Sequence, residues 1–121
     1  MSKRRKSRTF IALPHDVVNH HDYLNLSGNA VKLLIDIANQ YNGHNNGDFC
    51  VAFSIMEKRG WKSKSNLSNA KKELLKKNMI KLTRQGGRNK PSLYAIVWQP
   101  IDDCKGKLDI KSTILAPRSF K

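Results

Sequence analysis

The sequence predicts an α+β fold in which a three-helix core is followed by a β-hairpin, with a basic N-terminal arm and an extended C-terminal tail. Three observations carry this prediction: capped helices with regular apolar spacing, glycine-containing connections, and two apolar strands around a Gly-Gly turn. The 121 residues match the size of one domain. We expect an arm over residues 1–9, a folded domain over 10–98 and a partly docked tail over 99–121.

The first predicted elements are an arm and a short helix. Residues 1–9 lack apolar anchors that could offset the entropy cost of ordering, so we expect them to be disordered. Pro14 suits the first turn of a short helix, because its fixed φ is helical and that turn needs no N–H donor. This helix should include Val17 and end near His20.

The clearest helix of the sequence covers residues 28–41. Ser27 precedes it as an N-cap, and its apolar residues recur at spacings of three and four. We expect it to end at the connection 42–47, where Asn and Gly tolerate the positive φ of a tight turn. A short strand over residues 49–51 should follow.

A shorter helix is expected over residues 53–59, with Ile55 and Met56 pointing into the core. Gly60 follows at the position where helix ends favour glycine, since it adopts positive φ without strain. We expect Trp61 to cap the core beside this turn.

The next predicted helix, over residues 63–78, combines an apolar stripe with a polar face. Ser63 is placed to cap its N-terminus, and Asn78 is suited to a left-handed exit. The inward residues should be Leu67, Ala70 and Leu74, which lie on one side of the helix.

A hairpin is predicted after this helix. Residues 80–83 alternate inward and outward as a strand, residues 85–91 form a Gly-rich tip, and residues 92–98 return as a second strand. Both faces of the return strand are apolar, so we expect its second face to be covered by residues 10–13 or by the tail. We interpret Trp61, Tyr94 and Trp98 as core residues and not as base-stacking platforms.

The charge of the chain is strongly positive and localised. Lys and Arg number 23 against 9 Asp and Glu, which gives a formal net charge of +14. The net charge is +5 in residues 1–9, −3 in residues 10–50, +10 in residues 51–98 and +2 in residues 99–121. A small domain with such a charge normally has a polyanionic partner, with nucleic acid the first candidate and an anionic membrane surface the second.

The predicted order of elements is that of a winged helix-turn-helix, in which the second helix of the motif enters the major groove of DNA. On a helical wheel, the face opposite the apolar stripe carries only hydrogen-bonding and cationic side chains. Asn can pair bidentately with adenine, and Lys can contact guanine or phosphate. The candidate base-reading residues are Ser65, Asn66, Ser68, Asn69 and Lys72.

Further residues, all but one of them basic, are candidates for contacts with the DNA backbone. The free N–H groups at the start of the helix offer a phosphate site, and the flexible cationic hairpin tip and arm can approach a backbone or a minor groove. The candidates are Ser63, Lys64 and Lys76 on the helix, Arg84, Arg88 and Lys90 in the hairpin, and Arg4 and Arg5 in the arm.

Four segments carry a resemblance to a known family. They are LSGNAVKLL (26–34), YNGHNNGD (41–48), KSKSNLSNAKKELLKKNMI (62–80) and TRQGGRNKPSLYAI (83–96). In these segments the chain resembles the small winged-helix proteins of bacterial phages, plasmids and integrated elements. The resemblance implies a sequence-specific double-stranded DNA-binding protein that acts as a transcriptional regulator of a mobile element.

Other classes of protein are less compatible with the sequence. Cys50 and Cys104 are far apart and outside any paired-Cys motif, so we expect two free thiols, with Cys50 buried. No apolar run is long enough for a membrane span or a secretory signal, so we expect a cytoplasmic, nucleoid-associated protein. The histidines show no helical i, i+4 pair, and no phosphate loop or paired carboxylates are present, so we expect no metal, no cofactor and no enzymatic activity.

The sequence is also compatible with alternatives to DNA-dependent regulation. The lysines could form an ordinary solvated helix face, although the helix lacks the glutamates that usually pair with such lysines. The chain could be a replication-initiation accessory protein that binds repeated origin sites. It could also be an interaction or inhibitor module whose basic face binds an acidic protein partner. A homodimer is compatible with paired half-sites on DNA.

Overall fold

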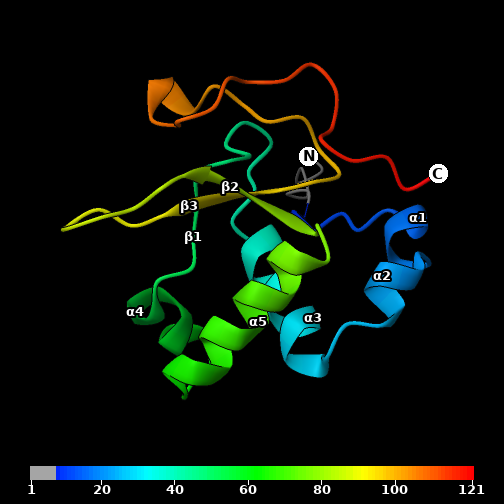
Figure 1. Cartoon of the computed structure of the whole chain (residues 1–121). Helices are drawn as coiled ribbons and strands as arrows, with labels where there is room; N and C mark the ends of the chain where they lie inside the picture. The colour runs from blue at the N-terminus through cyan, green and yellow to red at the C-terminus, as the bar shows by residue number, and fades with distance from the viewer. Residues whose placement is uncertain (1–7) are drawn as a thin grey trace, which may run out of the picture.

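The computed structural model describes residues 8–121 of the chain and shows an α+β fold. Five α-helices and a three-stranded antiparallel sheet are present in this part of the chain, with strand order β1-β3-β2. Helices α3, α4 and α5 lie on one side of the sheet, and the C-terminal tail passes over the other side (Figure 1). The predicted disordered arm falls on residues 1–9, and its first seven residues lie outside the described part.

Two short helices precede the core helices. The predicted short helix is present as α1 (His15–Val18), but Pro14 is its extended N-cap and not part of the first turn, and the helix ends at Val18 and not near His20. A second short helix, α2 (His21–Leu24), follows directly and was not predicted. It begins with a side-chain cap, because Nδ1 of His20 accepts a hydrogen bond of 3.1 Å from the backbone N–H of Asp22.

Helix α3 (Gly28–Ala38) has the predicted N-cap, with Oγ of Ser27 accepting from the N–H of Ala30 at 3.1 Å. The predicted end at residue 41 is wrong. The helix stops at Ala38, and the next turns are tighter, with the N–H groups of Gln40 and Tyr41 bonding to carbonyls three residues earlier. The side-chain amide of Gln40 bonds to both backbone groups of Cys50, at 3.0 and 2.8 Å. Cys50 itself is only half-buried, which corrects the expectation of a buried thiol.

The expected short helix divides into α4 (Phe53–Met56) and a 3₁₀ turn, η1 (Glu57–Arg59). Gly60 ends it with a φ of 93°, in the left-handed region, as predicted. Met56 is fully buried, whereas Ile55 is 42% exposed, so the expectation that both point inward is wrong for Ile55. In a helix of one turn, adjacent side chains point in different directions, and only one of these two reaches the core.

Helix α5 (Lys64–Lys76) follows the prediction closely. Oγ of Ser63 accepts from the N–H of Asn66 at 3.1 Å, and Asn78 leaves the helix with a φ of 56°. The buried residues of the helix are Leu67, Ala70 and Leu74, as the apolar spacing predicted.

The sheet consists of β1 (Phe49–Cys50), β2 (Ile80–Arg84) and β3 (Leu93–Ile96). All four residues of β3 are buried, because this strand is central and covered on both faces. The predicted alternation along β2 is wrong at Thr83, which is buried. A bulge between residues 82 and 84 turns its hydroxyl to the carbonyl of Gly47, at 2.6 Å.

Both candidate segments add residues to the core, although Phe10 and Ile11 of the N-terminal segment stay exposed. In the tail, Phe120 is 8% exposed and joins the main core, and Leu13 of the N-terminal segment packs against it. Ile101 is buried on the tail side near Gly47, whose missing side chain leaves room for Leu108. A Cβ at this glycine would lie 2.7 Å from that leucine's Cδ1. The tail is therefore docked in part, as expected.

Asn46 joins the end of β3 to the tail. The residue is fully buried, and its Oδ1 accepts from the N–H of Ile96 at 2.9 Å. Its Nδ2 lies 3.0 to 3.1 Å from three carbonyl oxygens, those of Ile96, Gln99 and Pro100. The side-chain amide of Asn46 thus bonds the backbone N–H and carbonyl of Ile96, as the peptide group of a neighbouring strand would.

A second buried polar centre forms around Asp36 on α3, which is 5% exposed. Its carboxylate accepts from Lys32 Nζ at 2.9 Å, from Trp61 Nε1 at 2.8 Å and from the Arg59 guanidinium at 3.1 and 3.2 Å. Burial by itself raises the pKa of Asp36, but the hydrogen bonds from Lys32 and Trp61 outweigh it and lower the pKa below its ordinary value. This carboxylate therefore holds the turn after η1 against α3.

We expect Asp36→Ala to lower the free energy of unfolding by about 3 kcal/mol, because it leaves the Trp61 N–H and two cations without their acceptor. Since the folded pKa lies below the ordinary 3.8, the stabilisation is complete above that value and is lost as the pH falls through the folded pKa. Asp36→Asn should therefore flatten the acid limb of a stability curve, measured by urea unfolding from pH 6 to pH 2. An unchanged acid limb in Asp36→Asn would contradict this assignment.

Candidate nucleic-acid interface

The exposed face of α5 carries the predicted base-reading residues. Ser65, Asn69, Lys72 and Lys76 are exposed and recur at intervals of four and three residues, which places them on one stripe of the helix. Asn66 is also exposed, on an adjacent side, whereas Ser68 is half-buried at the edge of the stripe. The structure thus brings most of the predicted set to one surface.

This face of α5 is free of carboxylates. Glu73 is the only acidic residue of the helix, and its carboxylate oxygens accept from the N–H and the hydroxyl of Ser27, both at 2.7 Å. Glu73 therefore points towards α3, and its negative charge interacts favourably with the positive end of the helix dipole at the N-terminus of α3. No acidic partner within ion-pair distance is found for Lys72 or Lys76 among residues 8–121.

The N-terminal end of α5 is arranged for capping. Ser63 caps the helix, and its hydroxyl lies 3.0 Å from that of Ser65, so both serines have hydrogen-bond partners within the protein. Lys64 places its Nζ 5.6 Å from the centroid of the Phe53 ring on α4, and Lys71 places its Nζ 5.9 Å from that of Tyr94 on β3. These lysines border the exposed stripe on the side of α4 and the hairpin.

The hairpin between β2 and β3 carries two exposed cations at its tip, Arg88 and Lys90. Gly87 and Lys90 exchange backbone hydrogen bonds of 2.9 and 3.2 Å, which close the tip. Gly86 is required by space, because a Cβ there would lie 2.4 Å from the N of Ser92. We call residues 85–92 the wing.

Arg84 lies at the base of the wing and not at its tip. Its Nη2 donates to the carbonyl of Pro91 at 2.8 Å, so the guanidinium bridges the two sides of the hairpin. The residue is half-buried. This contact stabilises the wing, which the sequence did not indicate for Arg84. The other two backbone candidates, Arg4 and Arg5, lie outside the described residues.

Three carboxylates in or near the tail are used in contacts within the protein. Asp48 pairs with Lys107 at 2.9 Å, and Asp102 accepts from the backbone N–H of Asn46 at 2.8 Å. Asp109 accepts from the N–H of Gln85 at 2.8 Å. Because the tail lies across the sheet from α5 (Figure 1), this separates its negative groups from the cationic helix face.

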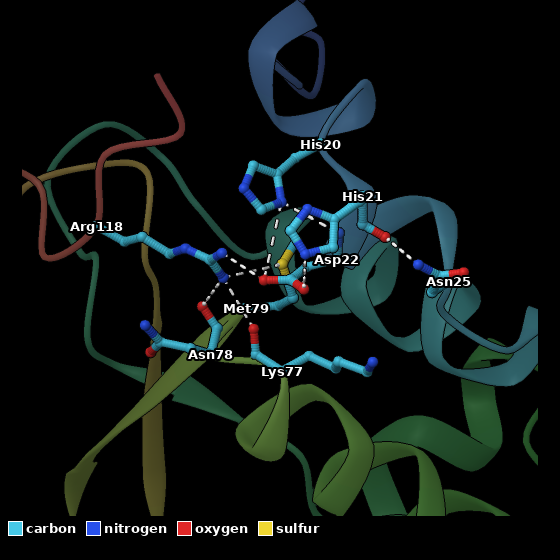
Figure 2. Close-up of polar contacts among 8 residues, drawn as sticks. All are labelled: His20, His21, Asp22, Asn25, Lys77, Asn78, Met79 and Arg118. Atoms are coloured by element: carbon cyan, nitrogen blue, oxygen red, sulfur yellow. Dashed lines mark hydrogen bonds and ion pairs between the residues drawn. The ribbon is translucent and has the colours of Figure 1, made fainter.

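Arg118 attaches the tail to the helices, a role that the sequence did not reveal. Its guanidinium pairs with Asp22 and donates to the carbonyls of Lys77 and Asn78, at 2.8 and 3.1 Å (Figure 2). The bond from Arg118 lowers the pKa of Asp22 below its ordinary value. One side chain thus neutralises α2's carboxylate and caps carbonyls at the C-terminal end of α5.

The same region holds three side chains of metal-ligating type, and their spacing in the sequence is not that of a helical i, i+4 pair. One ligand atom each from His20, His21 and Asp22 lie within 4.8 Å of one another. Figure 2 shows these side chains facing one another with Arg118 beside them. The Arg118 guanidinium is already paired with the Asp22 carboxylate, and its positive charge would repel a metal cation at this place.

A cavity of about 560 Å³ lies between the segment 8–12 and the end of β3. Its lining includes Phe10, Tyr41 and Trp98. Burial, followed by the charge of Asp102, raises the pKa of Tyr41. This cavity involves none of the α5 stripe or the wing.

Comparison of the chain with protein-family models, curated proteins and solved structures finds no match. No helix within residues 8–121 is long and apolar enough to cross a membrane.

Proposed function

We propose that the chain is a winged helix-turn-helix protein that binds double-stranded DNA sequence-specifically. The element order α3, β1, α4, α5, β2, β3 supports this fold, as does the pairing of β1 with β3. The left-handed Gly60 between the two helices of the motif supports it further. The resemblance described above favours a role as a transcriptional regulator of a phage or other mobile element.

One observation carries the proposal: the exposed face of α5 combines hydrogen-bonding and cationic side chains with no carboxylate. Asn69 and Ser65 supply groups that match base edges, while Lys72 and Lys76 supply charge for phosphate or guanine. Arg88 and Lys90 are exposed on the wing and add a second cationic group. A helix reading the major groove with a flanking backbone contact uses these two features together.

Asn69 is the residue that we expect to carry most of the sequence preference. Its amide can pair bidentately with adenine, and such a pair discriminates by about 1–3 kcal/mol. In Asn69→Ala we therefore expect the preferred base at one position to be lost, with affinity for unrelated DNA unchanged. Selection from a random duplex pool at a stated salt concentration measures this for both proteins.

Asn25→Ala is a matched control, because Asn25 is an exposed asparagine that follows α2 and belongs to neither α5 nor the wing. It should select the same sequences as the unmodified protein. If the unmodified protein selects no sequence, the proposed specificity is wrong. If Asn69→Ala selects the same sequences, the assignment of the reading residue is wrong.

A further inference from the structure

The wing is supported by the tail in addition to its own hairpin. The backbone N–H of Asp109 donates to the carbonyl of Thr83 at 2.9 Å, and its carboxylate accepts from the N–H of Gln85 at 2.8 Å. These two bonds span the position where the register of β2 shifts and the wing begins. A single tail residue therefore holds both sides of this junction.

The tail segment around Asp109 is itself anchored. Leu108 is half-buried over Gly47, and Lys107 pairs with Asp48 at 2.9 Å. The hydroxyl of Thr83 donates to the carbonyl of Gly47, so the base of the wing and the tail contact the same loop. Asp109 thus directly follows two anchored residues, Lys107 and Leu108, and can act as a fixed acceptor.

Gln85, the first residue of the wing, has no partner in the opposite strand for its backbone N–H, and Asp109 supplies the acceptor. Regular pairing between β2 and β3 ends at Arg84 and Leu93. Beyond it, the N–H of Gly86 bonds to the side chain of Ser92 at 2.8 Å, and Gly87 pairs with Lys90. The N–H of Gln85 turns to the tail instead.

We propose that Asp109 is a positioning residue that fixes the base of the wing and thereby the direction in which Arg88 and Lys90 point. The expected effect of Asp109 on DNA affinity rests on the proposed function. The structural role assigned to the C-terminal tail does not. Asp109 contacts no DNA itself. Its negative charge would oppose DNA, so a role in binding has to come from geometry.

The sign of the effect on affinity tests this role. Removing a carboxylate makes the protein more positive, which by charge alone strengthens DNA binding. Asp109→Ala should instead weaken binding to a mixed-sequence duplex at low salt, on the order of fivefold, because about one phosphate contact is lost. Asp103→Ala is the matched control, since Asp103 is exposed in the same tail and its carboxylate makes no hydrogen bond to the rest of residues 8–121. It should bind equally or more tightly.

The conservative variant Asp109→Asn retains an oxygen that accepts from Gln85. We expect it to bind at least as tightly as the unmodified protein, which a general loss of tail structure would not produce. If Asp109→Ala binds as tightly as Asp103→Ala, the positioning role in DNA binding is overturned.

Hydrogen exchange of the free protein separates this inference from the proposed function. In Asp109→Ala the amide of Gln85 should exchange about tenfold faster, because a charge-assisted hydrogen bond is lost, while amides of α5 stay unchanged. Unchanged exchange at Gln85 would overturn the inference even if the protein binds DNA. If the unmodified protein binds no duplex, the proposed function fails, and accelerated exchange at Gln85 still supports the structural role of Asp109.

Discussion

Asn46→Ala should lower the free energy of unfolding by about 3–5 kcal/mol. The substitution removes the partner of the Ile96 N–H and the donor to three carbonyls, those of Ile96, Gln99 and Pro100. Asn46 is fully buried, so water cannot replace these bonds without opening the structure. The loss is a large fraction of the roughly 5–15 kcal/mol that holds a typical domain folded.

Urea unfolding followed by circular dichroism measures this loss, and the thermal midpoint should fall by roughly 10–20 °C. Asn42→Ala in the same loop is the matched control. Asn42 is exposed and its Oδ1 accepts one hydrogen bond, from the N–H of His44 at 2.8 Å, so we expect a loss of less than about 1 kcal/mol. Equal losses in the two variants would show that the Asn46 amide has no special role.

Asn46→Asp gives a sharper test, because it preserves the shape of the side chain and removes its donors. The carboxylate would face the carbonyls of Ile96, Gln99 and Pro100 and lie beside Asp102, whose Oδ2 is 2.8 Å from the Asn46 N. We expect this variant to be destabilised at neutral pH as strongly as Asn46→Ala. Full stability of Asn46→Asp at neutral pH would contradict the assigned hydrogen bonds.

Local signals in the sequence predicted much of the fold. The caps at Ser27 and Ser63, the helix exit at Gly60 and the left-handed Asn78 are all confirmed. Each of them depends on a residue and neighbours within about four positions, which is the range over which helix caps and turns act. The buried stripe of α5 was predicted for the same reason.

Contacts between distant segments could not be predicted. Asn46 bonds to residues about fifty positions away, and Arg118 bonds to Asp22 across ninety-six positions. Neither residue type signals its partner, since asparagine in a turn and arginine in a tail are common at the surface. The expectation that Ile55 is buried is wrong for a related reason. Its hydrophobicity can be read from the sequence, but which side chain of a one-turn helix faces the core depends on how that helix packs.

In the candidate site, too, local features could be predicted from the sequence and contacts between separate segments could not. The stripe of Ser65, Asn69, Lys72 and Lys76 follows from helical geometry, and all four are exposed. The charge of Arg84 predicts a DNA contact, whereas in the structure its guanidinium donates to the Pro91 carbonyl across the hairpin. Charge can be read from a sequence, but a hydrogen bond across a hairpin requires its register and turn geometry.

Reversing two charges on α5 should nearly abolish DNA binding. In the double variant Lys72→Glu with Lys76→Glu, we expect affinity for duplex DNA to fall on the order of 100-fold at moderate salt, because two phosphate-directed cations become repulsive anions. The slope of log affinity against log salt should become shallower by about 2, since each lost phosphate contact contributes about 0.9. Both side chains are exposed on the helix, so the fold should be unaffected.

The double variant Lys111→Glu with Lys121→Glu separates local contact from total charge. Both lysines are exposed in the tail, and the change in net charge is the same. If α5 contacts DNA, this control should lose less than about tenfold in affinity and keep its salt slope, because distant charges act only through a screened field. Equal losses in the two double variants would mean that binding follows net charge alone, and the proposed face of α5 would then be wrong.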